Sequence, residues 1–221
     1  MINRDVKAVI FDQDGLMFDT ERISVEAWHL VGEEWGIHLE EEFLSTVRGM
    51  NVRDAAERFR QELGGSVDYV RFKEEKQERF EAMLRQRGIP VKPGLKELLA
   101  FLKEHGYKIA MATASTKEYS LENLREAGIE DYFDYIITGD MVVHAKPDPE
   151  VFLKSAEALG ERPENCMVLE DSLNGLEAGL RGGFITVMVP DLTQPDEALR
   201  SRVDSVCSSL FQVKELLEGV S

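Results

Sequence analysis

The 221-residue chain carries 42 acidic against 26 basic side chains, so its formal net charge is -16 at pH 7, and 43% of its residues are apolar. This negative charge repels polyanions and argues against nucleic acid or an acidic membrane surface as a partner. No stretch approaches the roughly 18 apolar residues that a membrane helix needs, and the N-terminus leads into a strand-like run rather than a signal peptide. We expect a cytoplasmic monomer whose two cysteines, Cys166 and Cys207, are buried free thiols.

Short apolar runs of strand length recur along the chain, and most are separated by segments with helical period. They occupy residues 6–11, 108–113, 135–138, 167–169 and 184–189. Alternating strands and helices predict an α/β protein with a parallel sheet.

One interval, residues 20–87, keeps helical spacing of its apolar positions and contains no convincing strand. It predicts a helical insertion between turns at residues 15–20 and 88–94, which are rich in residues that end helices. We therefore divide the chain into a core of residues 1–17 and 88–221 and a helical domain of residues 18–87.

Within the insertion, a helix predicted to begin near Asp68 carries a lysine on its apolar face. Lys76 is four residues from both Phe72 and Phe80, so it shares their side of the helix. Its ammonium either reaches out to solvent along the apolar stem or contacts a substrate phosphate.

The first predicted strand ends at Asp12 and Asp14. Strand alternation can direct both side chains to one side while Gln13 points away. In open α/β sheets ligands bind beyond the carboxyl ends of the strands, which is where this pair would lie. The alternative is a turn or helix cap, because Asp-x-Asp-Gly also suits a turn.

A second acidic pair, Glu170 and Asp171, follows the fourth apolar run. Four carboxylates at one sheet edge repel one another unless a cation is present, and an oxygen-rich site with open positions suits Mg²⁺. The alternative role is N-capping of a helix that starts near Ser172.

Thr113 ends the second run, and its hydroxyl, with Ser115 and the backbone amides around Ala114, could hold phosphate oxygens. Residues 115–118 also form a capping box for the next helix, and both roles can coexist. Lys146 is by default a solvated surface lysine. If it reaches the carboxylates, one charge pair at about 4 Å is worth roughly 4 kcal/mol at an effective dielectric constant of 20.

Taken together, these features resemble the four motifs of the haloacid dehalogenase superfamily, in the same order: Asp12-x-Asp14-Gly15, Thr113, Lys146-Pro147 and Glu170-Asp171. The resemblance spans the chain and is strongest to the phosphatase and β-phosphoglucomutase-like branch. It implies a Rossmann-like parallel-sheet core with an inserted helical cap domain.

The resemblance further implies that Asp12 attacks phosphorus to give an aspartyl phosphate. Asp14 would protonate the leaving oxygen and later activate water or a hydroxyl. Thr113 and Lys146 would bind the transferred phosphoryl group together with Ala114 and Ser115. Mg²⁺ would be held by Asp12, Asp171 and the backbone carbonyl of Asp14, with Glu170 close by.

The cap would select the substrate through Lys76 and a segment containing Arg48, Gly49, Met50 and Asn51. The β-phosphoglucomutases carry a cap histidine where this chain has Ser24, although Lys76 matches a mutase cap lysine. Gln13 also departs from the hydrophobic residue usual between the two aspartates. We therefore predict a magnesium-dependent phosphatase of a small phosphorylated metabolite such as a sugar phosphate, with a phosphohexomutase as the alternative.

A third hypothesis is a non-catalytic phospho-acceptor, since receiver domains also combine an acidic cluster, a hydroxyl residue and a lysine. The chain is far longer than a minimal receiver, and an insertion follows its first strand. A Walker-type nucleotide enzyme is disfavoured because no Gly-x-x-x-x-Gly-Lys-Ser/Thr loop occurs.

Overall fold

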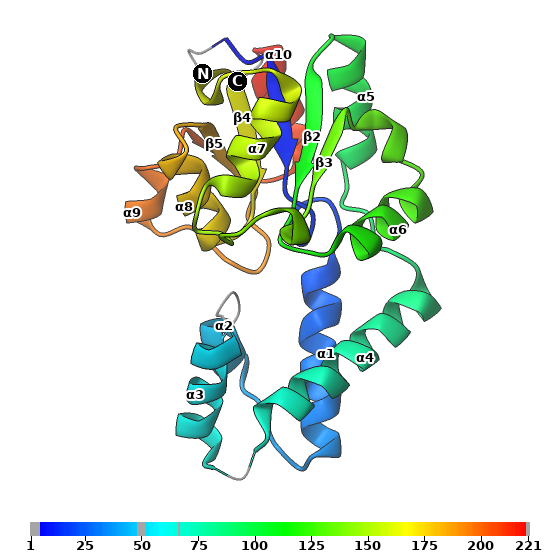
Figure 1. Cartoon of the computed structure of the whole chain (residues 1–221), viewed down its shortest axis with the longest axis vertical. Coiled ribbons are helices and arrows are strands. Elements are labelled where there is room, and N and C mark those ends of the chain that lie inside the picture. The colour runs from blue at the N-terminus through cyan, green and yellow to red at the C-terminus, as the bar shows by residue number, and fades with distance from the viewer. Residues whose placement is uncertain (1–4, 48–51, 66, 220–221) are drawn as a thin grey trace. The chain divides into compact units, whose positions relative to one another are not determined.

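The structure, a computed structural model, describes residues 5–47, 52–65 and 67–219 (Figure 1). The chain divides into two compact units, residues 1–19 with 89–221 and residues 20–88. These boundaries lie a residue or two beyond the ones predicted from the sequence.

The larger unit contains, in the described part of the chain, a six-stranded parallel sheet with strand order β3-β2-β1-β4-β5-β6. The strands are β1 (Ala8–Phe11), β2 (Lys108–Ala112), β3 (Tyr135–Ile137), β4 (Cys166–Glu170), β5 (Ile185–Met188) and β6 (Ser205–Val206). The predicted α/β class and Rossmann-like sheet are confirmed. The short edge strand β6 was not predicted, because its two residues give no periodic signal.

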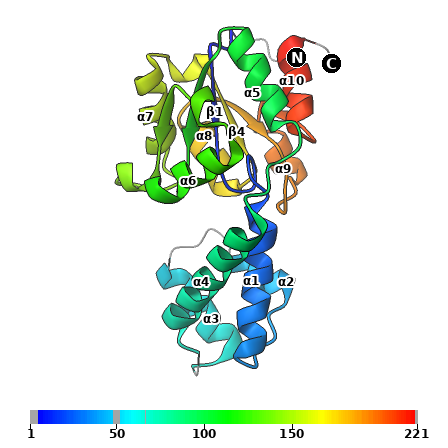
Figure 2. The same cartoon turned by 90° about the vertical axis from the view of Figure 1, so that its right-hand side faces the viewer.

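Helices cover both faces of this sheet (Figure 2). They are α5 (Leu95–Glu104), α6 (Lys117–Ala127), α7 (Glu150–Leu159), α8 (Leu173–Arg181), α9 (Glu197–Arg200) and α10 (Leu210–Glu218), with 3-10 turns η1 (Glu130–Tyr132), η2 (Gly139–Met141) and η3 (Pro163–Asn165). Along β1, Val9 and Phe11 belong to the apolar cluster that includes α5 and α10, while Ala8 and Ile10 belong to the cluster that includes α7. Burial on both faces explains why β1 is apolar throughout.

The smaller unit consists of α1 (Thr20–Glu34), α2 (Glu41–Val47), α3 (Val52–Leu63) and α4 (Tyr69–Arg87). No described residue between 20 and 88 is in a strand. Aromatic rings form much of its core, with Trp28 stacked on Phe72 at 5.7 Å between ring centroids. Asp68 caps α4 by accepting hydrogen bonds from two backbone amides of its first turn, as its position before the helix predicts.

The two segments that connect the units are hydrogen-bonded to each other within the larger unit. The Asp19 amide donates to the Pro90 carbonyl at 2.8 Å, and the Lys92 amide donates to the Met17 carbonyl at 2.9 Å. The Lys92 ammonium lies 2.7 Å from a buried carboxylate oxygen of Asp191 and 3.3 Å from Asp19. The two connections are therefore joined to each other by hydrogen bonds within the larger unit.

Cys166 and Cys207 are free and buried, as expected. None of the helices in the described ranges combines the length and the apolar character of a membrane span.

Candidate active site

The carboxylates predicted to meet at the sheet edge follow two neighbouring strands. Phe11 of β1 pairs with Leu169 of β4, and the Asp12 amide continues the ladder by donating to the Leu169 carbonyl at 3.1 Å. Side-chain oxygens of Asp12, Glu170 and Asp171 all lie within 4.8 Å of one another, and all three residues are buried. Strand register therefore brings Asp12 together with the acidic pair Glu170 and Asp171, which is far away in the sequence.

Lys146 reaches this cluster from the loop before α7. Its ammonium donates to Asp12 Oδ1 at 2.5 Å, to Glu170 Oε1 at 2.7 Å and to the Ala112 carbonyl at 3.2 Å. It also lies 4.6 Å above the Phe152 ring. Only 9% of its side chain is exposed, so Lys146 is not a solvated surface lysine.

Burial and neighbouring charges act on the same three groups. Burial, and next the negative charge of Glu170, raise the pKa of Asp12 well above its usual value, although Lys146 opposes the shift. Burial lowers the pKa of Lys146, but the charges and hydrogen bonds of Asp12 and Glu170 outweigh it and hold that pKa above its usual range. Lys146 therefore stays charged. Ionisation of all the carboxylates would leave excess negative charge, which a cation would relieve.

Two glycines lie so close to the acidic side chains that a larger residue would occupy the same space. Gly15 has φ +86°, and a Cβ there would lie 2.2 Å from Asp171 Oδ2. A Cβ at Gly175 would lie 1.7 Å from Glu170 Oε1. A Cβ at either position would force the neighbouring carboxylate to move.

Glu170 also orders the start of α8. Its Oε2 accepts hydrogen bonds of 2.9 Å from the amides of Asp171 and Ser172. Ser172 is the N-cap of α8, and its hydroxyl accepts the Gly175 amide at 3.1 Å. Glu170 thus stabilises the helix start with one oxygen and contacts Lys146 with the other.

The hydroxyl residues after β2 lie beside the carboxylates. Thr113 is buried, and its hydroxyl accepts the Ser115 amide at 3.0 Å. The Ser115 hydroxyl donates to Asp14 Oδ2 at 2.8 Å. The predicted capping box is wrong, because α6 begins at Lys117 with Thr116 as N-cap, and Thr116 makes no side-chain capping bond.

Asp14 has two further donors that the sequence did not indicate. The Tyr119 hydroxyl donates to Asp14 Oδ1 at 3.3 Å, and the Gln13 amide nitrogen donates to Asp14 Oδ2 at 3.3 Å. Tyr119 lies in the first turn of α6, where helical periodicity alone gives an aromatic residue no functional meaning.

In the helical unit, Lys76 is only 8% exposed, so it does not extend into solvent. Its ammonium donates to the Ser24 hydroxyl at 2.7 Å and lies 4.9 Å from the centroid of the Phe80 ring and 5.5 Å from that of Trp28. The other predicted cap contacts, Arg48, Gly49, Met50 and Asn51, lie outside the described residues.

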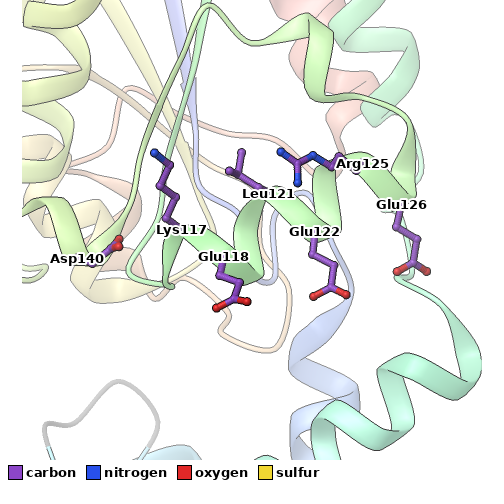
Figure 3. Close-up of a pocket in the computed structure, with 7 residues that line it drawn as sticks. All are labelled: Lys117, Glu118, Leu121, Glu122, Arg125, Glu126 and Asp140. Atoms are coloured by element: carbon purple, nitrogen blue, oxygen red, sulfur yellow. The ribbon is translucent and has the colours of Figure 1, made fainter.

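A surface hollow of about 960 Å³ runs along α6 and contains none of the motif residues (Figure 3). Its lining consists of Lys117, Glu118, Leu121, Glu122, Arg125, Glu126 and Asp140. Four of these seven residues are acidic, which disfavours an anionic ligand there. A separate group, His144, Asp148 and Glu150, also brings possible metal-ligand atoms together at the surface. There the Glu150 carboxylate already accepts the amides of Val143 and His144.

A sequence profile described as haloacid dehalogenase-like hydrolase matches residues 6–183. A Thermotoga maritima protein named phosphorylated carbohydrates phosphatase is 36% identical over 97% of this chain and 91% of its own length. The solved structure of CbbY from Rhodobacter sphaeroides in complex with phosphate is 27% identical, covers 94% of this chain and 96% of its own, and superposes with a TM-score of 0.76. The β-phosphoglucomutase structure from Clostridium difficile is 26% identical, with a TM-score of 0.74 and coverage of 98% of this chain and 100% of its own.

Proposed function

Because the chain belongs to the haloacid dehalogenase-like hydrolase family, we propose that it is a magnesium-dependent phosphatase of a small phosphorylated metabolite, in particular a sugar phosphate. The predicted enzyme class, a phosphoric monoester hydrolase, is supported by the relative named as a phosphatase of phosphorylated carbohydrates. The observation that carries the proposal is the convergence of Asp12, Lys146 and Glu170 at the ends of β1 and β4.

Asp12 is the nucleophile of the proposed reaction. A carboxylate oxygen of Asp12 forms a bond to phosphorus while the bond between phosphorus and the ester oxygen breaks. Asp14 gives its proton to that departing oxygen, so the alcohol leaves neutral. The covalent intermediate divides one difficult displacement into two easier steps.

In the second step the roles of Asp14 are reversed. Its carboxylate takes a proton from a water molecule as that water attacks phosphorus, and the bond to Asp12 breaks. Inorganic phosphate leaves, and both aspartates return to their starting protonation states. Asp14 can serve as acid and then as base because the first step leaves it deprotonated and the second step returns its proton.

Positive charge and hydrogen-bond donors position the phosphoryl group. Lys146 supplies a permanent charge beside Asp12, held in place by Glu170 and the Ala112 carbonyl. The hydroxyls of Thr113 and Ser115 and the amides around Ala114 are the proposed donors to the phosphoryl oxygens. Such donors stabilise the charge that spreads over these oxygens during transfer.

The acidic cluster fits a divalent cation. Carboxylate oxygens of Asp12, Glu170 and Asp171 lie together there, and oxygen ligands are what Mg²⁺ prefers. Asp12, Asp171 and the backbone carbonyl of Asp14 would hold the ion, with Glu170 close by. The approach of Gly15 to Asp171 leaves no space for a side chain where this carboxylate lies. When bound, Mg²⁺ would neutralise charge on the transferred phosphoryl group and favour the ionised form of Asp12.

A phosphohexomutase is the second candidate, and the structural similarity to a β-phosphoglucomutase favours it. Both enzymes would share the phosphoenzyme and differ in whether water or a sugar hydroxyl removes the phosphoryl group. Ser24, in place of the mutase cap histidine, supports hydrolysis. Lys76 is the proposed substrate contact of the helical unit in either case.

The test is phosphate release from a panel of sugar phosphates with and without Mg²⁺, with glucose 6-phosphate formation from β-glucose 1-phosphate followed in parallel. We expect magnesium-dependent phosphate release without isomerised product. Asp12→Asn should lower turnover by about 10⁴-fold or more, whereas Asp131→Asn, at an exposed position, should not. Isomerised product with little free phosphate would identify a mutase, and full activity of Asp12→Asn would exclude the mechanism.

A further inference from the structure

We propose that Tyr119 is a positioning residue that, together with Gln13, holds Asp14 in the orientation it needs to protonate the leaving oxygen. This inference rests on the proposed function, since it concerns how the assigned acid is kept in place. Tyr119 lies outside the motifs from which the site was predicted, and Gln13 occupies the middle position of the first motif, where a hydrophobic residue is usual.

The geometry around Asp14 is that of a carboxylate fixed at both oxygens. Tyr119 donates to Oδ1 at 3.3 Å, while Gln13 at 3.3 Å and Ser115 at 2.8 Å donate to Oδ2. Asp14 is half-buried. A short side chain that accepts hydrogen bonds at both oxygens loses its rotational freedom, and this holds a reacting group in one orientation.

Gln13 is an unusual neighbour for this role because it is fully buried. Burying an amide costs free energy unless it is hydrogen-bonded, so a polar side chain at such a position needs a purpose. Its amide nitrogen donates to the adjacent Asp14, whereas its buried amide oxygen accepts no hydrogen bond from the described residues. A hydrophobic side chain of similar size could not make the contact with Asp14. The bond to Asp14 is therefore the reason we assign for a glutamine here.

Ser115 alone cannot hold Asp14 throughout the reaction. Its hydroxyl can donate only one hydrogen bond, and in the proposed reaction it also donates to an oxygen of the phosphoryl group. When the Ser115 hydroxyl turns to the substrate, Asp14 Oδ2 loses its shortest hydrogen bond. Tyr119 at Oδ1 and Gln13 at Oδ2 then continue to donate, one to each oxygen, and keep the carboxyl group in place.

Tyr119 is well placed for this task because its backbone is fixed. It lies in the first turn of α6, half-buried, two residues after the helix begins at Lys117. Its ring is rigid apart from two side-chain torsions, so little freedom is lost in holding its hydroxyl at Asp14 Oδ1.

The experiment compares phosphoenzyme formation in a single turnover from phenyl phosphate and from p-nitrophenyl phosphate. Phenolate is the more basic leaving oxygen and depends more on a correctly placed acid, whereas p-nitrophenolate leaves readily without a proton. We expect Tyr119→Phe to slow phosphoenzyme formation from the phenyl ester by about 10-fold and from the p-nitrophenyl ester clearly less. The ratio of the p-nitrophenyl rate to the phenyl rate should therefore rise. KM should change little, because Tyr119 is not a proposed substrate contact.

Gln13→Leu is the second variant, and it should raise the same ratio. The matched control is Tyr135→Phe, at an exposed tyrosine of β3 outside the site, which should leave both rates unchanged. A merely structural effect of Tyr119→Phe would lower both rates equally and would refute the inference, as would two unchanged rates. If the unmodified protein forms no phosphoenzyme from either ester, the proposed function itself fails.

Discussion

Lys76 Nζ donates a hydrogen bond of 2.7 Å to Ser24 Oγ inside the helical unit. Two aromatic rings, Trp28 and Phe80, face the same ammonium. Moving an ammonium out of water costs several kcal/mol, and the Ser24 hydroxyl and the two rings each offset part of that cost. A buried ammonium on the apolar face of α4 is therefore the first residue of the helical unit to test for a role in substrate binding.

The first prediction concerns this buried ammonium. Lys76→Met keeps the apolar stem and removes both the charge and the desolvation cost of burying it, so the free energy of unfolding should stay within about 1 kcal/mol of that of the unmodified protein. The kcat/KM for the sugar phosphate that is hydrolysed best should fall by about 10- to 100-fold, the value of one hydrogen bond to a charged group. Urea unfolding and steady-state kinetics measure the two effects. Lys73→Met, at an exposed position of the same helix, is the control and should change neither.

A second prediction separates two effects of replacing Gly15, the strain of a left-handed backbone and the collision of a Cβ with Asp171. Gly15 and Gly128 both have positive φ, but only at Gly15 would a Cβ collide with a side chain, Asp171. Alanine at either position should cost about 1–2 kcal/mol of stability through the left-handed backbone. Gly15→Ala should in addition weaken Mg²⁺ binding by at least about 10-fold, as titration calorimetry would show. Equal Mg²⁺ affinity in the two variants would contradict the assignment of Asp171 as a ligand.

A third prediction concerns the metal itself. Mg²⁺ at 100 times its dissociation constant should stabilise the folded protein by about 2.7 kcal/mol, because it binds the folded state alone. Asp171→Asn should lose most of this stabilisation, while Asp131→Asn, at an exposed position, should keep it. Thermal unfolding with Mg²⁺ and with a chelator measures the difference. Retained stabilisation in Asp171→Asn would move the metal site elsewhere, with the group around His144 as the next place to examine.

A fourth prediction is a pH dependence at Glu150. Hydrogen bonds from Lys154 and then from the amides of Val143 and His144 lower the pKa of Glu150 to about 2. A carboxyl group whose folded pKa is depressed adds stability above its unfolded pKa and loses it as the pH falls. Glu150→Gln should therefore be less stable than the unmodified protein at pH 7, and the gap should narrow as the pH falls below about 4.5.

Urea unfolding at pH 7, 4 and 3 checks this behaviour. Glu157→Gln, at an exposed position of the same helix α7, provides the control, since it should show no such narrowing. A difference in the free energy of unfolding that stays constant with pH would mean that Glu150→Gln destabilises the protein through altered packing and not through the lost charge.

The sequence was sufficient to predict which strand ends meet. Residue patterns located β1 and β4, and parallel pairing then placed Asp12 beside Glu170, because carboxyl ends of parallel strands share one edge. The position of Lys146 could not be obtained this way. It comes from an irregular loop, and only the packed structure shows that its side chain runs back to Ala112 and the carboxylates.

Other features could not be predicted from the sequence because local patterns compete with tertiary contacts. Residues 115–118 read as a capping box, yet the Ser115 hydroxyl donates to Asp14, which lies 101 residues away in the sequence. Tyr119 gave no signal, since an aromatic residue on an amphipathic helix is normally packed in the core. The Lys76 position on the apolar face of α4 was predictable, but its bond to Ser24 required the fold of the helical unit.

The paired connections at Asp19–Pro90 and Met17–Lys92 have an evolutionary consequence. Because the chain leaves and re-enters the sheet unit between hydrogen-bonded neighbours, residues 20–88 can be exchanged for another helical insertion without shifting the register of any strand. Recombination at the two ends of this segment, near residues 19 and 89, would replace the proposed substrate selector and leave Asp12, the proposed nucleophile, and Lys146 in place. New specificities could then arise by exchange of a whole module, with no intermediate in which the chemistry is lost.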